Sequence, residues 1–183
     1  MVYDKRGSVM VLVVVIVAAV TVIASLMLSV AMGQFRIRKS NSELRKAFYL
    51  SEDGLNRTYS NIYELMCDAR EKGLRLADEY LTDNPDDDEG AEEIFVNSYK
   101  RYILDNVSGC AKGQNPRTEI INRRNLTFLG GRLIVIVSSV YISESGTEKR
   151  TYADIVVCIP SYAEVRSGAK ESEMLLYYAG FNL

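Results

Sequence analysis

Three cysteines, Cys67, Cys110 and Cys158, are the first side chains in this sequence that could do chemistry. They are odd in number and lack the close spacing of thiolate metal sites, so at most one disulfide can form within the chain. Cys110 and Cys158 are the favoured pair. Three buried or idle thiols are the alternative, because the spacing of cysteines in one sequence does not show which of them meet in space.

Histidine is absent from the chain. This excludes histidine-based zinc sites, Ser-His-Asp triads and Cys-His nucleophile pairs within it. Pairs of Asp and Glu residues occur, but none has the arrangement of a general acid and base. We therefore expect no enzymatic activity, no cofactor and no metal site.

An acidic segment, residues 82–90, suggests calcium at first sight, because it holds five carboxylates and ends in Gly90. In the EF-hand register that makes Gly90 the sixth loop residue, Pro85 falls on the first ligand position and Val96 on the closing glutamate. Neither side chain can bind calcium. The turn formers and like charges of this segment instead predict a solvated loop.

The composition is that of a folded domain, with 25% charged and 48% apolar residues. The formal net charge of -2 does not favour direct binding of nucleic acid. Removing the first 35 of the 183 residues leaves 148, enough for one compact domain.

An uninterrupted apolar run from Val9 to Gly33 precedes that domain, and the next charged residue is Arg36. At about 1.5 Å per helical residue the run spans roughly 36 Å, which exceeds the hydrocarbon core of a bilayer at about 30 Å. Its polar side chains, Thr21, Ser25 and Ser29, can bond back to carbonyls of the preceding turn. The run predicts a membrane-spanning helix.

The helical pattern continues beyond the apolar run. Residues 34–66 contain no proline and one glycine, Gly54. Apolar side chains recur there at steps of three, four or seven, namely Leu44, Phe48, Leu55, Tyr59, Ile62 and Met66. This predicts a long amphipathic helix continuous with the membrane helix. Two helices hinged around Gly33 are the alternative.

The rest of the chain predicts a small α+β domain. Residues 68–81 are rich in helix formers, and a shorter helix is expected over 91–107. Residues 132–143 and 151–159 are rich in Val, Ile and Tyr and predict an antiparallel hairpin, with 118–128 as a weaker strand. The tail, residues 167–183, fits a strand or a helical turn. The predicted fold is a long N-terminal helix packed on a small antiparallel sheet.

Two segments resemble the N-terminal region of PilX-type minor pilins, within the type IV pilin and pseudopilin family. The first is Lys5-Arg6-Gly7-Ser8 followed by the apolar run, which is similar to a prepilin processing site. The second, residues 47–55 (AFYLSEDGL), resembles the "AxxxAExG"-like segment on the helix of these proteins. Together they cover about a third of the chain.

The resemblance implies a leader peptide over residues 1–7, with Lys5 and Arg6 as its basic residues. A membrane prepilin peptidase would cut between Gly7 and Ser8 and methylate the new terminus. Residues 8–35 would form the transmembrane helix, 36–66 its amphipathic continuation, and 67–183 an extracytoplasmic domain. The implied partners are other pilin subunits, the peptidase, the pilus assembly platform and membrane lipid.

One position departs from the family pattern, because major pilins usually carry a glutamate five residues into the mature chain, where this chain has Leu12. A carboxylate in lipid is costly unless it is paired, and Leu12 removes both that cost and the pairing. The departure resembles certain minor subunits that cap or prime a fibre rather than abundant shaft subunits.

A basic cluster, Arg36, Arg38 and Lys39, follows the apolar run and is expected at the membrane surface. Counting these charges, together with Arg45 and Lys46, against Lys5 and Arg6 predicts that the domain lies in the cytoplasm. The family resemblance implies the opposite orientation, since its leader is cut on the cytoplasmic side.

Two other functions fit the same sequence. Ser29-Val30-Ala31 offers small residues for signal peptidase, which would release a secreted binding domain beginning at Met32. A plain single-pass protein with a regulatory or ligand-binding domain is the other.

Overall fold

The structure is a computed structural model that describes residues 5–167 and 175–182, with side chains described for 9–167 and 175–180. The chain divides into two compact units, Met1–Arg45 and Lys46–Leu183. Its elements in order are α1 (Lys5–Asp83), α2 (Asp88–Asn106), the 3₁₀ turn η1 (Val107–Gly109), β1 (Arg117–Ile120), the 3₁₀ turn η2 (Arg123–Asn125), β2 (Arg132–Ile142), β3 (Glu148–Cys158), α3 (Tyr162–Arg166) and β4 (Leu176–Asn182).

Helix α1 passes Gly33 without interruption, as predicted, so the alternative of two helices hinged there is wrong. It also continues past Met66, where the expected amphipathic segment ended, to Asp83. The helix formers over 68–81 therefore belong to α1. Asn84 and Pro85 then stand outside helix, and α2 begins at Asp88, so the acidic loop is shorter than expected.

The four strands form one antiparallel sheet in the order β1-β2-β3-β4. β2 and β3 make the predicted hairpin, with Arg132 opposite Cys158 and Ile142 opposite Glu148. β1 has four residues, of which three fall within the weaker candidate 118–128, and it begins one residue earlier. The ambiguous tail supplies β4 as an edge strand beside β3.

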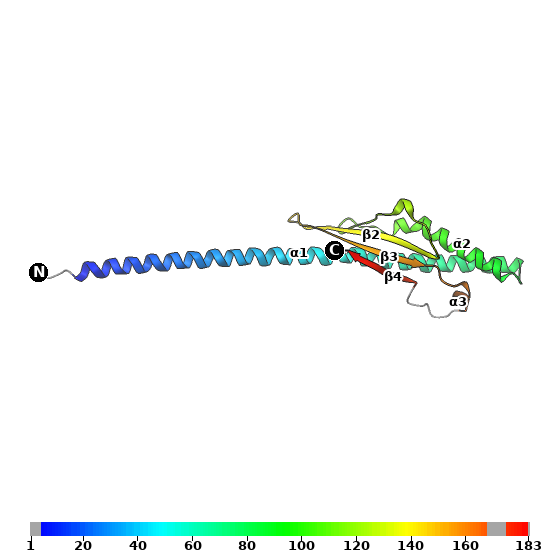
Figure 1. Ribbon diagram of the computed structural model, residues 1–183, viewed down its shortest axis with the longest axis horizontal. Helices are drawn as coiled ribbons and strands as arrows, with labels where there is room; N and C mark the ends of the chain where they lie inside the picture. Colours follow the sequence, from blue (N-terminus) through cyan, green and yellow to red (C-terminus); the bar gives the residue numbers. More distant parts are fainter. Residues whose placement is uncertain (1–4, 168–174, 183) are drawn as a thin grey trace. The chain divides into compact units, whose positions relative to one another are not determined.

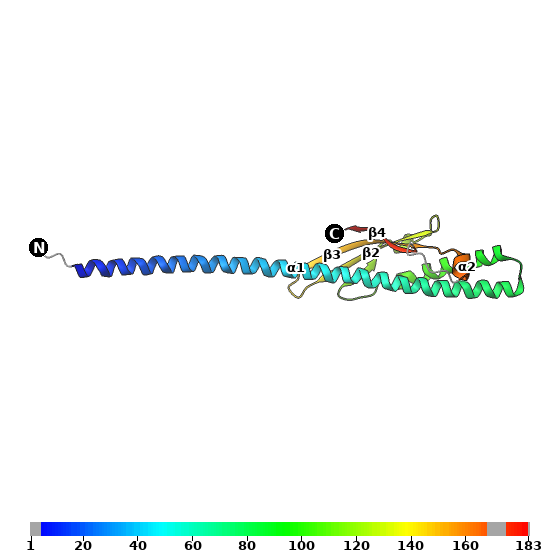
Figure 2. The ribbon, with the colours of Figure 1, turned by 90° about the horizontal axis from the view of Figure 1, so that it is seen from below.

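Within the second unit α1 lies along one face of the sheet, and α2 runs back beside the distal part of α1 (Figures 1 and 2). The core between helix and sheet is apolar. Its fully buried members include Leu55, Ile62, Tyr99, Ile103, Leu133, Val135, Val137, Ile155 and Val157. The α+β fold with a long N-terminal helix and a small antiparallel sheet is thus as predicted.

The expected apolar stripe on α1 is right only in part. Leu55, Ile62 and Met66 are buried, whereas Leu44 is 46% exposed and Phe48 and Tyr59 are half-buried. Small and hydroxyl-bearing side chains share the buried face instead, namely Ala47, Ser51, Thr58, Ala69 and Ala77. The recurrence of large apolar side chains does not detect them. Small side chains are buried on this face because the helix and the sheet approach each other closely there.

Candidate functional site

The apolar part of α1 presents its large side chains outward. Between Val9 and Met32 these side chains are from 52% to 74% exposed. Among the described residues α1 is the one helix long and apolar enough to cross a membrane. Thr21 Oγ1 donates to Val17 O at 2.7 Å and Ser25 Oγ to Thr21 O at 2.8 Å, so both hydroxyls are satisfied within the helix, as lipid requires.

The expected processing junction stands at the start of α1. Lys5, Arg6, Gly7 and Ser8 belong to the helix, while the placement of their side chains lies outside the described part of the structure. The residues that the resemblance assigns to cleavage are therefore present as helical backbone directly before the exposed apolar segment.

The basic cluster on α1 is exposed. Arg36, Arg38 and Lys39 are exposed, and they alternate with Phe35 at 68% and Ile37 at 63% exposure. Cations interleaved with apolar side chains are typical of a segment at a lipid headgroup surface, where each cation contributes about 1 kcal/mol.

The second segment of the resemblance, residues 47–55, packs directly on the sheet. A Cβ built on Gly54 would overlap Ser139 Oγ and would lie 2.9 Å from Pro116 Cγ and 3.0 Å from Thr118 Cγ2. Ala47, Ser51 and Thr58 continue the same buried face of α1. Glycine is needed at position 54 because three strand and loop side chains occupy the space of a side chain.

A row of three hydroxyls faces this part of α1. Thr118 on β1 pairs in register with Ser139 on β2, which pairs with Thr151 on β3. All three side chains are buried, and their hydroxyl oxygens have no hydrogen-bond partner among the described residues. Near Gly54, therefore, α1 and the sheet are in close contact through small and hydroxyl-bearing side chains. Elsewhere in the core between α1 and the sheet the buried side chains are mostly Leu, Ile and Val.

Strand β4 is tied to α1 by two tyrosines. The rings of Tyr59 and Tyr178 stack with centroids 4.8 Å apart. Tyr59 Oη donates to Leu176 O at 2.9 Å, and Tyr178 Oη donates to Asn56 Oδ1 at 3.1 Å. Burial, then Tyr59 and Glu52, raise the pKa of Tyr178 to about 12.

The three cysteines are free thiols in the structure, so the favoured pairing of Cys110 with Cys158 is not made. Cys110 is buried against α1, where its Sγ lies 3.6 Å from Asn61 O and its carbonyl accepts from Asn61 Nδ2 at 2.8 Å. Burial raises the pKa of the Cys110 thiol. Cys158 ends β3, where its backbone N–H donates to Leu175 O at 2.8 Å.

The acidic loop is organised for capping α2. Asp87 Oδ1 accepts from Gly90 N at 3.0 Å, and Asp87 Oδ2 accepts from Tyr80 Oη at 2.5 Å. The bond from Tyr80, followed by that from Gly90, lowers the pKa of Asp87. No group of three metal-binding side chains occurs in the described residues. The loop therefore connects α1 to α2, and Asp87 caps the start of α2.

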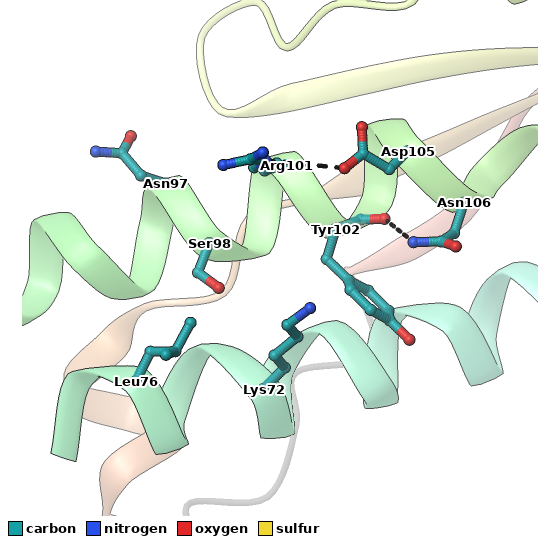
Figure 3. A pocket seen from close by; sticks show the side chains of 8 residues that line it. All are labelled: Lys72, Leu76, Asn97, Ser98, Arg101, Tyr102, Asp105 and Asn106. Carbon is teal, nitrogen blue, oxygen red and sulfur yellow. Dashed lines mark hydrogen bonds and ion pairs between the residues drawn. The ribbon is translucent and has the colours of Figure 1, made fainter. Parts of the chain in front are cut away.

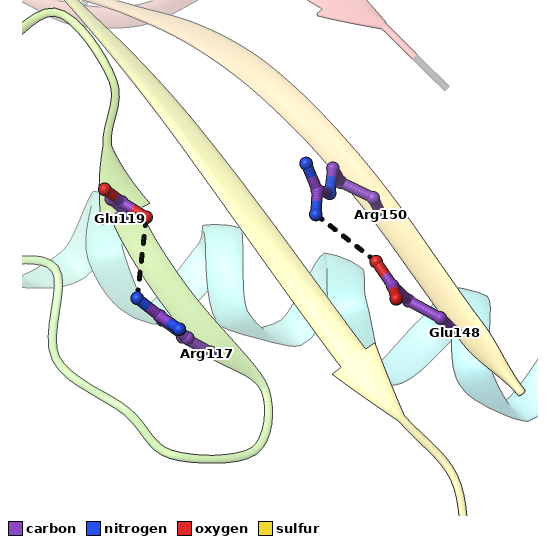
Figure 4. A network of polar contacts seen from close by, with 4 residues as sticks. All are labelled: Arg117, Glu119, Glu148 and Arg150. Atoms are coloured by element: carbon purple, nitrogen blue, oxygen red, sulfur yellow. Dashed lines mark hydrogen bonds and ion pairs between the residues drawn. The ribbon is translucent and has the colours of Figure 1, made fainter. Parts of the chain in front are cut away.

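Charged side chains of β1 and β3 lie on the outer face of the sheet (Figure 4). On β1, Arg117 Nη2 lies 3.9 Å from Glu119 Oε2, and on β3, Arg150 Nη2 lies 3.3 Å from Glu148 Oε1. These side chains are 51% to 73% exposed, so their ion pairs add little to stability.

Comparison of the chain with protein-family models, curated proteins and solved structures gave no match.

Sequence reasoning missed the buried face formed by Ala47, Ser51, Gly54 and Thr58. A signal for it was present, because small residues recur there at steps of four, three and four, the spacing of one helix face. The partners Thr118, Ser139 and Thr151 carried no such signal, since strands that are distant in sequence bring them together.

Proposed function

We propose that the chain is a minor pilin or pseudopilin, a structural subunit of a type IV pilus or of a related secretion or DNA-uptake filament. The observation that carries this proposal is the combination found on α1. A basic-Gly-Ser start precedes an exposed apolar segment, and the same helix later closes on an antiparallel sheet at the second segment of the resemblance. Filament subunits of this family use such a helix twice, as an anchor before assembly and as a packing element afterwards.

The apolar segment supports a role in assembly rather than catalysis. Its side chains are exposed within their own unit, and small residues interrupt the large ones, namely Ala18, Ala19, Ala24, Ser25 and Gly33. Close approach of helices at such positions favours their association in lipid. Lipid tails are as apolar as the helix surface, so close packing rather than hydrophobic burial drives this association. Neighbouring pilin helices are the partners we propose, brought together by the assembly platform.

Leu12 narrows the proposal to a minor subunit. Helix entry into a filament would proceed without the carboxylate pairing of abundant shaft subunits, as suits a subunit that primes or caps the fibre. In this proposal the second unit is extracytoplasmic, and Arg36, Arg38 and Lys39 contact anionic headgroups until the helix leaves the membrane.

The test is the N-terminal residue and mass of the mature protein, isolated from its native membrane with and without the prepilin peptidase. A start at Ser8 carrying a methyl group, dependent on the peptidase, supports the proposal and the outward orientation together. Retention of Met1 or Val2 in both strains contradicts processing.

A matched pair of variants sharpens this test. Gly7→Leu should block cleavage, because the peptidase needs the leader to end in glycine according to the resemblance. Gly33→Leu is the control, since a Cβ at Gly33 meets nothing within 4 Å and lies far along the helix from the junction. Equal cleavage of both variants would argue against a prepilin site.

The exposed apolar segment also fits a second function, a membrane-anchored or secreted extracytoplasmic binding domain. The same measurement separates them. A start at Met32 identifies a released signal peptide, and an unprocessed chain that stays in the membrane identifies a simple anchor.

A further inference from the structure

We propose that the groove between α1 and α2 binds a sugar acid, held by its carboxylate on Lys72. The groove has a volume of about 620 Å³, within the usual range for small-ligand sites. Lys72 and Leu76 line it from α1, and Ser98 and Tyr102 line it from α2 (Figure 3). Both helix segments belong to the second unit, and this site goes beyond a structural role in a filament.

Lys72 supplies a positive charge that no carboxylate of the described residues pairs with. Its ammonium lies 4.8 Å from the centroid of the Tyr102 ring, which holds it by a cation–π contact. No carboxylate of the described residues lies within 4.0 Å of it. Among the described residues that line the groove, Asp105 is the acidic one, and its Oδ2 forms an ion pair with Arg101 Nε at 3.9 Å. An anionic ligand can therefore approach Lys72 without displacing an internal ion pair.

The other groups around Lys72 suit a hydroxylated ligand. Figure 3 shows the Ser98 side chain directed from α2 toward α1, and Lys72 reaching from α1 toward α2. Ser98 and Tyr102 are half-buried, and each carries a hydroxyl that can donate and accept. Half-buried Leu76 adds an apolar surface on which the carbon face of a sugar ring can rest.

The charge balance favours a ligand with one anionic group over a polyanion. Of the two cations among the described residues that line the groove, Arg101 has an ion pair with Asp105 and Lys72 has none. A nucleic acid or a phosphorylated polymer would need several unpaired cations. A single carboxylate beside hydroxyl groups, the chemistry of a uronic acid, matches one ammonium beside two hydroxyls.

The experiment uses the full chain in detergent micelles and ligand-observed saturation-transfer NMR. The probes are glucuronic acid, glucose and acetate. Glucose tests the hydroxyl groups alone, acetate tests the carboxylate alone, and glucuronic acid carries both. We expect saturation transfer to glucuronic acid, with affinity about tenfold higher than for glucose or acetate, since a charged hydrogen bond contributes that much. Lys72→Met should abolish the difference while retaining the apolar stem over Tyr102.

Lys100→Met is the matched control, because Lys100 lies on α2 and does not line the groove. It should bind as the parent does, and the thermal unfolding of both variants should stay close to that of the parent, because methionine keeps the apolar stem of the lysine that it replaces. Equal binding of glucose and glucuronic acid, equal binding of acetate, or unchanged binding in Lys72→Met would each overturn the proposal. None of these outcomes depends on processing at Gly7, so the pilin proposal is tested separately.

Discussion

Ser139 Oγ on β2 occupies the position that a Cβ on Gly54 of α1 would require. The contact joins the helix segment that resembles minor pilins to the middle of the sheet. It shows why a glycine stands in a buried helix interior, where alanine would otherwise stabilise the helix by about 1 kcal/mol.

Substitution of Gly54 by alanine should destabilise the second unit. The added methyl would overlap Ser139 Oγ and crowd Pro116 and Thr118, and overpacking of this kind costs about 1–3 kcal/mol. Chemical unfolding of the full chain in micelles, followed by tyrosine fluorescence, measures the loss. Ser139→Ala, combined with Gly54→Ala, should restore part of it because the Oγ is removed.

Gly33→Ala provides the comparison, since nothing lies within 4 Å of a Cβ there. It should leave the unfolding of the second unit unchanged. Equal losses at the two glycines would mean that helix propensity, not contact with the sheet, explains Gly54.

Replacement of Thr151 by valine should stabilise the fold by about 1 kcal/mol. The Thr151 hydroxyl is buried and has no hydrogen-bond partner among the described residues, so its removal ends a desolvation cost. Thr58→Val should have the opposite effect, because Thr58 Oγ1 donates to Gly54 O at 3.0 Å. Equilibrium unfolding of the two variants tests the contrast, and destabilisation by both would show that the Thr151 hydroxyl is satisfied.

Stability should fall at alkaline pH in a manner that depends on Tyr178. Its pKa in the folded chain is about 12, against 10.0 for an ordinary tyrosine. The folded state therefore keeps the phenol neutral, a contribution that is complete below pH 10 and is lost as pH rises toward 12.

Unfolding curves of the parent and of Tyr178→Phe, recorded from pH 8 upward, test this dependence. At pH 8 the variant should be less stable by about 1 kcal/mol through loss of the bond to Asn56. The gap should narrow above pH 10, because only the parent loses stability by ionisation of this group. A constant gap would contradict the raised pKa.

Loss of the Asp87 carboxylate should weaken the start of α2. Asp87→Ala removes the acceptor for Gly90 N and Tyr80 Oη and should lower the unfolding midpoint by about 2–4 °C. Asp87→Asn should retain most of the cap. Asp86→Ala, at an exposed neighbouring position, should have little effect.

The pH dependence of this cap follows from the lowered pKa of Asp87. Its contribution is present above the ordinary pKa of 3.8 and is lost as pH falls through the lower folded value. Thermal unfolding of the parent between pH 5 and 2 should therefore show a loss that Asp87→Asn lacks. Calcium should not change the midpoint of either chain, since the loop serves as a cap.

The sequence by itself determined the elements whose signals are local. The apolar run from Val9 to Gly33 predicted a helix, which is part of α1. The high content of Val, Ile and Tyr in 132–143 and 151–159 predicted the β2–β3 hairpin. The turn formers near Pro85 marked the end of one helix and the start of the next. Each of these depends on residues within a few turns or one hairpin of each other, where propensity and periodicity are strong.

Only the tertiary structure decided which surfaces meet. Burial of Ala47, Ser51 and Thr58 depends on a sheet formed by residues more than fifty positions away, and so does the need for glycine at position 54. The same holds for the thiols. Cys110 contacts Asn61 on α1 and forms no disulfide with Cys158, the pairing that the sequence favoured. The groove at Lys72 likewise exists because α2 folds back along α1. Contacts of this kind are set by packing between distant segments, and packing is not encoded in local spacing.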